Sequence, residues 1–384
     1  MRISIFVFSI LLVSWGMAST FNGLWAEETP ARYDDYLPTT GWRYSPPEAQ
    51  GMDSKTLANL VEKVTNSKER IHSITIIRNG YMLLDAYFDT FRIRKRHPIY
   101  SCTKSVISAL IGIAIKHGHV SDVHQRVSSF FPKQGVSTYG SAKRNITLKH
   151  LLTMTSGLNC TDSYLYRWKG LWEMRRSRDW AHFVLNLPMH EQPGTTFNYC
   201  NGVSHLLSEV IQRSTGMTAF EYAKQSLFAP LGINDVTWAQ NSTGVTIGYS
   251  DLMLTPHDMA KIGFLYLKNG LWGTQQIIPS EWVQQSFQPH VEATLFPQYG
   301  YQWWIDSSGY SIAAGYRGQY IFVLPDHNMV VVFTGSLEDR NFFLPVSYLN
   351  EYIVPAIKSN HALPYNDKSL NRLLSVIKDA QTSL

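Results

Sequence analysis

Apolar and polar positions follow two different rhythms near the start of the chain. Residues 54–67 place apolar side chains every three or four positions, which predicts a helix with one buried face. Residues 71–78 and 81–88 are rich in β-branched and aromatic residues, and Asn79-Gly80 separates them. Because Asn-Gly tolerates the positive φ angles of a type I′ turn, this pattern predicts an antiparallel hairpin after the helix.

From residue 103 to about residue 290 the periodicity is mostly helical. Thr255-Pro256 is typical of a helix start, and Gly270 is typical of a helix end. The predicted helices span residues 103–117, 148–154, 179–187, 203–215, 219–227, 256–269 and 280–287.

Strand character returns towards the end of the chain. The predicted strands span residues 299–305, 311–314, 319–324 and 329–334, and residues 341–359 are typical of a closing helix. The order is therefore sheet, helices, sheet. We expect an α/β protein of the α+β type, in which both ends of the chain build one antiparallel sheet flanked by terminal helices, and an all-helical lobe is inserted. The predicted units are residues 46–100 with 291–359 for the sheet lobe, 101–290 for the helical lobe and 360–384 for a C-terminal tail. A cleft is expected where the lobes meet.

The composition is that of a globular protein, since 44% of the 384 residues are hydrophobic and 16% are charged. The formal net charge is +5. Basic residues gather in two places: Arg92, Arg94, Lys95 and Arg96, and Arg175, Arg176 and Arg178. Such runs usually face water. A nucleic-acid-binding protein normally combines a basic stripe with a recognisable reading element, so we expect no nucleic-acid partner.

The N-terminus is typical of a secretory signal. Arg2 precedes an apolar run over residues 3–15, and small residues follow up to Ala18. Cleavage after Ala18 fits better than cleavage after Ala26. The run is shorter than the ~20 residues needed to cross a bilayer, so no stable membrane span is expected. We therefore assign residues 1–26 to a signal peptide and lead-in, and expect a periplasmic or secreted protein.

The cysteines are Cys102, Cys160 and Cys200. An odd number allows at most one intramolecular disulfide. Cys102 and Cys200 each adjoin a residue that we assign to catalysis, and we interpret both as small apolar fillers beside the site. No Cys-x-x-Cys or His-rich spacing predicts a metal site.

One candidate nucleophile begins an apolar helix, at Ser101-x-x-Lys104. Residues three apart share a helix face, so Lys104 can reach the Ser101 hydroxyl, and the backbone N–H groups of a helix N-terminus favour negative charge. These are conditions for an activated nucleophile. Ser375-x-x-Lys378 matches the same spacing, but it lies in a polar tail without partner motifs, so we set it aside.

A second motif is Tyr199-x-Asn201. A tyrosine near a lysine can pass a proton between nucleophile and leaving group, and an asparagine amide can hydrogen-bond to a substrate. Tyr348-x-Asn350 repeats the pattern inside the closing helix, where we expect Tyr348 to be a packing residue.

These motifs occur in a specific order together with other segments: 151–158 (LLTMTSGL), 193–197 (PGTTF), 251–270, 299–304 (YGYQWW) and 315–335. The combination resembles the serine β-lactamase and penicillin-binding protein superfamily over roughly residues 46–335. Its nearest branch looks like the class C β-lactamase-related serine hydrolases, which include esterases, D-amino-acid peptidases and 6-aminohexanoate-dimer hydrolase. The resemblance implies a β-lactamase/transpeptidase-like fold.

The resemblance also implies an acyl-enzyme route on a small ester or amide, with no metal or organic cofactor. Lys104 and Tyr199 would deprotonate Ser101, Tyr199 would protonate the leaving group, and water would release the acyl chain. The backbone N–H groups of Ser101 and Gln319 would form an oxyanion hole, where each donor contributes about 3 kcal/mol. Asn201 would bind the substrate.

In that superfamily a Lys-Thr-Gly or His-x-Gly motif lies on a strand that lines the cleft. The matching position is Tyr316-Arg317-Gly318, which keeps the glycine but lacks the leading cation. Tyr316 suits an uncharged or amphipathic acyl group, so poor β-lactamase activity is expected. By the same resemblance, Tyr316, Arg317 and Gly318 would contact the substrate. Arg317 could bind a carboxylate through its guanidinium, but strand alternation would point it away from Tyr316, and we favour solvent or a structural ion pair for it. Residues 268–270 (KNG) are typical of a helix end instead.

Three functions stay open at this point: an esterase or amidase, a peptidoglycan D,D-carboxypeptidase or penicillin-binding protein, and a non-catalytic binding protein on the same fold. The missing cation counts against the second. The retention of Ser101, Lys104, Tyr199 and Asn201 counts against the third.

Overall fold

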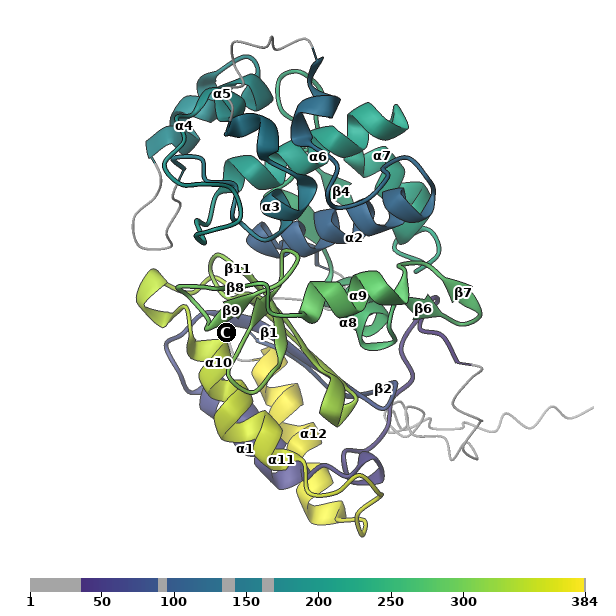
Figure 1. Ribbon diagram of the computed structural model, residues 1–384. Helices are drawn as coiled ribbons and strands as arrows, with labels where there is room; N and C mark the ends of the chain where they lie inside the picture. Colours follow the sequence, from purple (N-terminus) through teal and green to yellow (C-terminus); the bar gives the residue numbers. More distant parts are fainter. Residues whose placement is uncertain (1–35, 89–94, 133–141, 161–168, 383–384) are drawn as a thin grey trace, which may run out of the picture.

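The computed structural model describes residues 36–88, 95–132, 142–160 and 169–382, and Figure 1 shows them as two lobes, one built around a sheet and one of helices. The predicted signal segment, residues 1–26, lies outside the described residues. Arg92 and Arg94 of the first basic cluster lie outside them as well.

The main sheet has eight antiparallel strands. In spatial order they are β2 (Tyr81–Tyr87), β1 (Ile71–Arg78), β13 (Met329–Gly335), β12 (Gln319–Leu324), β11 (Ser311–Gly315), β10 (Trp304–Ile305), β9 (Gln298–Tyr299) and β8 (Val291–Glu292). Because β1 pairs with β13, the N-terminal hairpin joins the C-terminal strands in one sheet. The prediction of a single antiparallel sheet built from both ends of the chain is confirmed.

The turn of the N-terminal hairpin follows the predicted geometry. Asn79 has φ 53° and Gly80 has φ 79°, and Arg78 faces Tyr81 across the turn. Both central residues of a type I′ turn need positive φ, which Asn and Gly adopt at little cost. All eight residues of β1 are buried, because this strand is covered on both faces.

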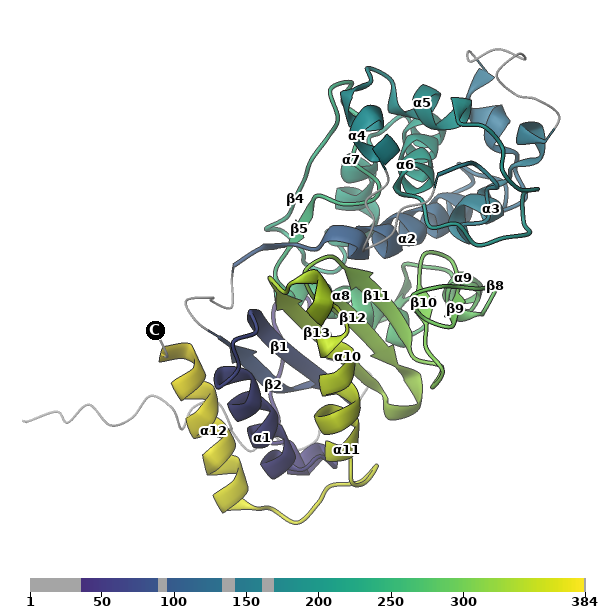
Figure 2. The ribbon, with the colours of Figure 1, turned by 90° about the vertical axis from the view of Figure 1, so that its left-hand side faces the viewer.

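Helices cover both faces of this sheet (Figure 2). One face carries α1 (Ser54–Thr65), α10 (Leu344–Tyr348), the π-helical turn η9 (Leu349–Ile353), α11 (Val354–Ala356) and α12 (Asp367–Thr382). The other face carries α8 (Pro256–Leu267), which packs against β12 and β13. The approach is close at Gly263, where an added Cβ would lie 2.6 Å from Val330 Cγ1.

The second lobe is helical. Its helices are α2 (Thr103–Lys116), α3 (Leu148–Leu152), α4 (Lys169–Arg176), α5 (Trp180–Asn186), α6 (Asn201–Thr215) and α7 (Ala219–Ala223), the last continued by a π-helical turn, Lys224–Phe228. Helix α2 is buried on all sides from Thr103 to Ala114, since it packs against α6, α7 and α9 (Ser280–Phe287) as well as β11. A helix that is apolar all round belongs in a core.

Short strands make up the rest of the sheet structure. β3 (His97–Pro98), β5 (Leu252–Leu254) and β4 (Thr237–Trp238) form a three-stranded sheet beside the entry to α2, and β6 (Leu271–Trp272) pairs with β7 (Gln275–Gln276). None of these short strands was predicted from the sequence.

One predicted strand is divided in two. Residues 299–305 were expected to run straight, but they end β9, turn and begin β10. Gln302 lies in this turn with φ 62°, a left-handed conformation that no strand contains. The prediction was wrong because the apolar run continues through a turn that is itself buried.

The lobe boundaries also differ from the prediction. Helix α8 falls within 101–290 but packs on the sheet, and α12 replaces the expected tail at 360–384 by packing against α1 and β2. Its buried residues Leu370, Leu373 and Ala380 recur at helical spacing. The closing helix expected over 341–359 is broken into α10, η9 and α11.

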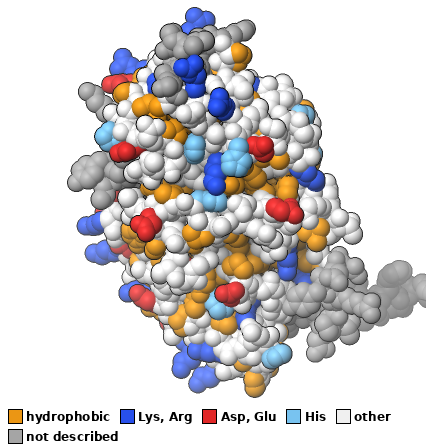
Figure 3. Space-filling model, in the orientation of Figure 1, with side chains coloured by type: hydrophobic (Ala, Val, Ile, Leu, Met, Phe, Trp, Pro, Cys, Tyr) orange, Lys and Arg blue, Asp and Glu red, His pale blue; other side chains and the backbone are white. Residues whose placement is uncertain are grey.

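Acidic and basic side chains are interspersed on the face drawn in Figure 3. Arg175, Arg176, Arg178 and Lys95 are exposed, and Arg96 is half-buried beside Asp235 at 3.4 Å. The expectation that the basic runs face water holds for Lys95, Arg175, Arg176 and Arg178, whereas Arg96 is partly covered.

Candidate active site

The Ser101 hydroxyl stands at the start of α2. The chain leaves β3, passes Ile99 and forms one 3₁₀ turn, Tyr100–Cys102, before α2 begins. Tyr100 has φ 46°, a conformation that is costly for a residue other than glycine and that is enriched at functional sites. Gly315, at the end of β11, permits this approach, since an added Cβ would lie 2.4 Å from Ile99 O.

Lys104 is 1% exposed and its ammonium nitrogen has three close oxygen partners. Nζ lies 2.9 Å from Ser101 Oγ, 2.7 Å from Asn201 Oδ1 and 3.2 Å from the Tyr249 carbonyl oxygen. Two partners are carbonyl oxygens, which can only accept hydrogen bonds. A neutral amine can satisfy both and still direct its lone pair at the Ser101 hydroxyl, whereas a cationic amine donates to all three. The same geometry therefore suits both states of a lysine that takes up and returns a proton.

Asn201 and Tyr199 reach this point from the start of α6. Asn201 is the first residue of the helix, and Tyr199 precedes its N-cap residue Cys200. The Tyr199 ring is stacked on Trp304 at 5.4 Å between centroids, and Lys104 Nζ lies 4.9 Å from the centre of the Tyr199 ring. The structure thus brings Ser101, Lys104, Tyr199 and Asn201 together. The acid–base role of the Tyr199 hydroxyl stays a prediction.

The segment 154–160 braces the tyrosine. Met154 O accepts a hydrogen bond from Asn198 N at 2.7 Å, and the Asn198 side-chain amide donates to Leu158 O at 3.0 Å. Gly157 has φ 75°, and a Cβ there would lie 2.3 Å from Glu191 O, so only glycine fits. The Leu-Thr-Met-Thr-Ser-Gly pattern therefore supports the site rather than supplying chemistry.

A disulfide between Cys160 and Cys200 joins the same two segments, with Cα atoms 5.5 Å apart. The interpretation of Cys200 as an apolar filler was wrong. Sequence spacing could not reveal the pairing, because the two loops become neighbours only through the fold.

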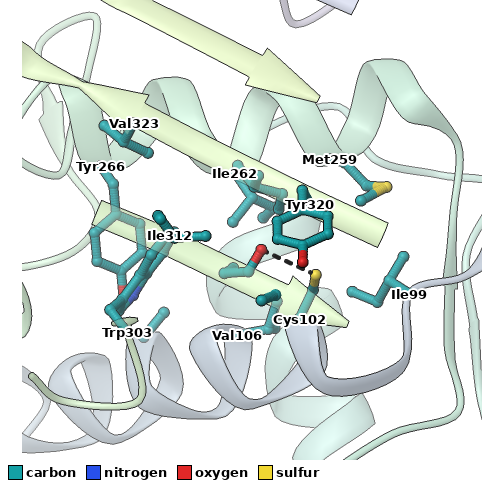
Figure 4. Packing of buried hydrophobic residues seen from close by; sticks show 14 of the residues in the cluster. Ile99, Cys102, Val106, Met259, Ile262, Tyr266, Trp303, Ile312, Tyr320 and Val323 are labelled. Carbon is teal, nitrogen blue, oxygen red and sulfur yellow. Dashed lines mark hydrogen bonds between the residues drawn. The ribbon is translucent and has the colours of Figure 1, made fainter. Parts of the chain in front are cut away.

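Cys102 is a buried free thiol, as expected for a filler. Figure 4 shows it at the start of α2, among the buried side chains of Ile99 and Val106. Its Sγ lies 3.4 Å from both Ala313 O and Gln319 O. Burial raises the pKa of this thiol well above its usual range, which keeps it protonated and able to donate.

The third predicted motif forms a turn and not part of a strand. β11 ends at Gly315 and β12 begins at Gln319, while Arg317 has φ 63° and Gly318 has φ 87°. The Tyr316 ring packs edge-on against Tyr100 at 5.5 Å. The expectation that strand alternation separates the side chains was wrong, since the exposed Arg317 guanidinium lies 5.7 Å from the centre of the Tyr316 ring.

Gln319 is the first residue of β12 and is 1% exposed. Its side-chain amide donates to Gly335 O at 2.7 Å and thereby ties β12 to the end of β13. The Gln319 carbonyl faces Cys102, next to Ser101. The backbone of Gln319 therefore lies beside the nucleophile, and its oxyanion role stays a prediction.

The competing motifs lie elsewhere. Ser375 and Lys378 are both exposed on α12. Tyr348 is buried at the end of α10, as expected for a packing residue. Residues 268–270 end α8, with Gly270 at φ 77°.

Sequence reasoning missed Tyr249, Gln302 and Trp304. Tyr249 contacts Lys104 through its main-chain carbonyl, which any residue would offer, so no side-chain pattern could indicate it. Gln302 and Trp304 belong to the Tyr-Gly-Tyr-Gln-Trp-Trp run, which carried a resemblance but no assigned task.

Sequence comparisons connect the chain with a known family. The sequence model of the family described as Beta-lactamase matches residues 66–346, well over half of the chain. The 6-aminohexanoate-dimer hydrolase of Paenarthrobacter ureafaciens is 23% identical over 337 residues, which cover 80% of this chain and 85% of that protein.

Two solved structures share the fold. The octameric penicillin-binding protein homologue from Pyrococcus abyssi has a TM-score of 0.62 at 19% identity, covering 81% of this chain and 79% of that one. A family VIII carboxylesterase has a TM-score of 0.62 at 13% identity, covering 88% of this chain and 98% of that one.

Proposed function

Because the chain belongs to the beta-lactamase family, we propose that it is a serine hydrolase that cleaves small carboxylic esters or amides through an acyl-enzyme on Ser101. One observation carries the proposal: buried Lys104 Nζ lies 2.9 Å from Ser101 Oγ while two carbonyl oxygens hold it in place. A lysine fixed in this way can accept the serine proton as the hydroxyl attacks a carbonyl carbon. The similarity to a hydrolase, the 6-aminohexanoate-dimer hydrolase, supports it.

The proposed reaction has two stages. Ser101 Oγ attacks the substrate carbonyl, and its proton passes through Lys104 and Tyr199 to the leaving group as the ester or amide bond breaks. Water then attacks the acyl-enzyme, and its proton returns through the same groups to Ser101 Oγ as the acyl group leaves as the acid. Backbone N–H groups of Ser101 and Gln319 would hold the carbonyl oxygen as it becomes negative, the charge that an oxyanion hole stabilises.

Substrate preference is proposed to depend on the turn between β11 and β12. Tyr316 packs against Tyr100, which is bonded directly to Ser101, so the turn borders the nucleophile. An aromatic face with a hydroxyl suits an uncharged or amphipathic acyl group better than the carboxylate of a β-lactam. Arg317 is the only cation of this turn, and its exposed guanidinium makes it the competing candidate for a carboxylate partner.

The test is a substrate panel: a short-chain p-nitrophenyl ester, the matching neutral anilide, an amide bearing a carboxylate, and benzylpenicillin. We expect kcat/KM for the ester to exceed that for penicillin, and Ser101→Ala to lower it by about 1000-fold or more. Ser375→Ala is the matched control and should leave it unchanged. Stable acylation by penicillin without ester turnover would favour the D,D-peptidase alternative. Selective loss of the carboxylate-bearing substrate in Arg317→Ala would overturn the preference for an uncharged acyl group.

We also propose that the protein acts outside the cytoplasm. The disulfide between Cys160 and Cys200 supports this, because such bonds form and persist in oxidising compartments. Among the residues that the structure describes, no helix is both long and apolar enough to cross a bilayer. A fusion of residues 1–26 to a reporter that is active only after export would test the proposal, and a reporter retained in the cytoplasm would contradict it.

A further inference from the structure

Gln302 is a buried polar residue at the junction of the two lobes, 2% exposed, in the turn between β9 and β10. Its side-chain amide donates to Leu151 O at 3.1 Å and Leu152 O at 2.9 Å, and its Oε1 accepts from Ser204 Oγ at 2.7 Å. Its main chain donates to Leu152 O at 3.1 Å and accepts from Ser105 Oγ at 2.8 Å. One residue thus binds three separate elements of the helical lobe: α2, α3 and α6.

Each of these contacts lies next to the proposed chemistry. Ser105 follows Lys104 on α2. Ser204 is three residues beyond Asn201 on α6, so the two are neighbours on the helix surface. The hydrogen bond from Lys104 to Asn201 therefore joins α2 to α6. Gln302 joins the same two helices through the neighbouring residues Ser105 and Ser204.

The tyrosine is supported from the same turn. The carbonyls of Leu151 and Leu152 end α3, two residues before Met154, whose carbonyl accepts from the residue preceding Tyr199. On the other side of Gln302, Trp304 stacks on the Tyr199 ring. The left-handed backbone of Gln302, at φ 62°, directs its side chain into the helical lobe while the flanking strands stay in the sheet.

We propose that Gln302 is a positioning residue for the hydrolysis, which fixes the distance between α2 and α6 and hence the placement of Lys104 against Ser101 and Asn201. The expected loss of kcat rests on the proposed function. The expected change in the distance between Lys104 and Asn201 does not depend on any substrate. Gln302 touches neither the nucleophile nor its lysine in the described contacts, so it acts only through the groups that it holds.

The amide is the group that this position requires. The two carbonyls of α3 need donors and the Ser204 hydroxyl needs an acceptor, and one carboxamide supplies both. Leucine would remove both side-chain donations to these buried carbonyls and would take the acceptor from the Ser204 hydroxyl, which is costly in a core. A glutamic acid satisfies one carbonyl only while it is protonated, and burial raises the pKa of such a carboxyl.

The experiment compares the parent with Gln302→Leu, Gln302→Glu and the milder Ser204→Ala, using kcat and KM on the short-chain ester across pH. Misplaced catalytic groups can cost about 100-fold, so we expect Gln302→Leu to lose kcat by roughly that factor with KM within about twofold. Ser204→Ala should show a smaller loss of the same kind. Gln302→Glu should retain activity at low pH and lose it as the carboxyl ionises, adding an alkaline limb absent from the parent.

Ser54→Ala is the control, since it removes a buried hydrogen bond to Glu48 in the sheet lobe, far from the site. It should lower the melting temperature without altering the kinetics. If Gln302→Leu and Gln302→Glu behave like this control, Gln302 is merely structural and the proposal is overturned. Crystal structures make the test independent of activity. We expect the distance from Lys104 Nζ to Asn201 Oδ1 to exceed hydrogen-bonding range in Gln302→Leu, and a bond unchanged at 2.7 Å would contradict the proposal even if the parent hydrolyses no ester.

Discussion

Tyr199 combines two tasks that a single substitution can separate. Its ring stacks on Trp304 and lies 4.9 Å from Lys104 Nζ, while its hydroxyl is assigned the transfer of protons. Tyr199→Phe keeps the ring and removes the hydroxyl. We expect turnover of the short-chain ester to fall by about 100-fold or more, the range for loss of a positioned acid or base. The melting temperature should stay near that of the parent.

Tyr348→Phe is the matched control, because Tyr348 repeats the motif spacing but lies in α10. Steady-state kinetics and calorimetry on both variants check the prediction. Parental turnover in a folded Tyr199→Phe protein would remove the hydroxyl from the mechanism.

At this scale the sequence predicted residues whose side chains act at short, regular spacings. Ser101 and Lys104 share a helix face, so three residues of separation suffice to bring them together. Tyr249 was not predicted because it contributes its main-chain carbonyl oxygen, which any residue would offer. The role of Gln302 was not predicted because its hydrogen-bond partners lie about 100 to 200 positions earlier in the chain, and a local sequence pattern cannot reveal such distant contacts.

At the scale of elements, the loops that carry residues 154–160 and 192–200 form one unit closed by the disulfide. We expect alkylation of the unfolded, unreduced protein to modify Cys102 alone, and alkylation after reduction to modify all three cysteines. In the folded protein Cys102 should not react, because it is buried and its raised pKa keeps it as the thiol. Intact-mass spectrometry counts the modified thiols. Three modified cysteines without reductant would show that the disulfide does not form.

Elements with their own start and stop signals were predictable. The Asn79-Gly80 hairpin and the capped helices need only local chemistry. The turn at Gln302 was not predictable, because the aromatic residues Tyr301 and Trp303 on either side of Gln302 continue the pattern of a strand and the hydrogen-bond partners of Gln302 are distant in sequence. The turn at Tyr316 was read as strand because the family resemblance describes a strand at that position, whereas β11 ends one residue earlier.

For the molecule as a whole, acid should lower stability through buried histidines. His205 is fully buried on α6 against Trp180, and burial lowers its pKa to about 3. An unfolded histidine titrates near 6.5, so between these values the unfolded state holds one proton more than the folded state. The free energy of unfolding should therefore fall as pH drops from about 6.5 towards 3, by up to about 1.4 kcal/mol per pH unit from His205.

Urea unfolding from pH 7 to pH 4.5 measures this slope. His72 and His97 act in the same direction, since burial lowers their pKa values to about 3 and about 4. His205→Leu should remove only the part due to His205, so its stability should decline less steeply than that of the parent. Equal slopes in the two proteins would show that His205 does not titrate as a buried neutral group.

The order of sheet, helices and sheet was sufficient to predict the two-lobe plan, since the simplest way to pair the strands from both chain ends is in one sheet. It could not assign each helix to a lobe. The apolar faces of α8 and α12 show that each helix must be packed against another element, but the periodicity does not identify that element.

The most direct test of the central claim is covalent labelling of the nucleophile. A fluorophosphonate should add to the folded protein once, and peptide mapping should find the adduct on Ser101. Labelling should disappear in Ser101→Ala and persist in Ser375→Ala. It should slow markedly in Lys104→Ala, because Lys104 is proposed to accept the proton of the Ser101 hydroxyl. An adduct on Ser375, Ser105 or Cys102 with Ser101 unmodified would contradict the account.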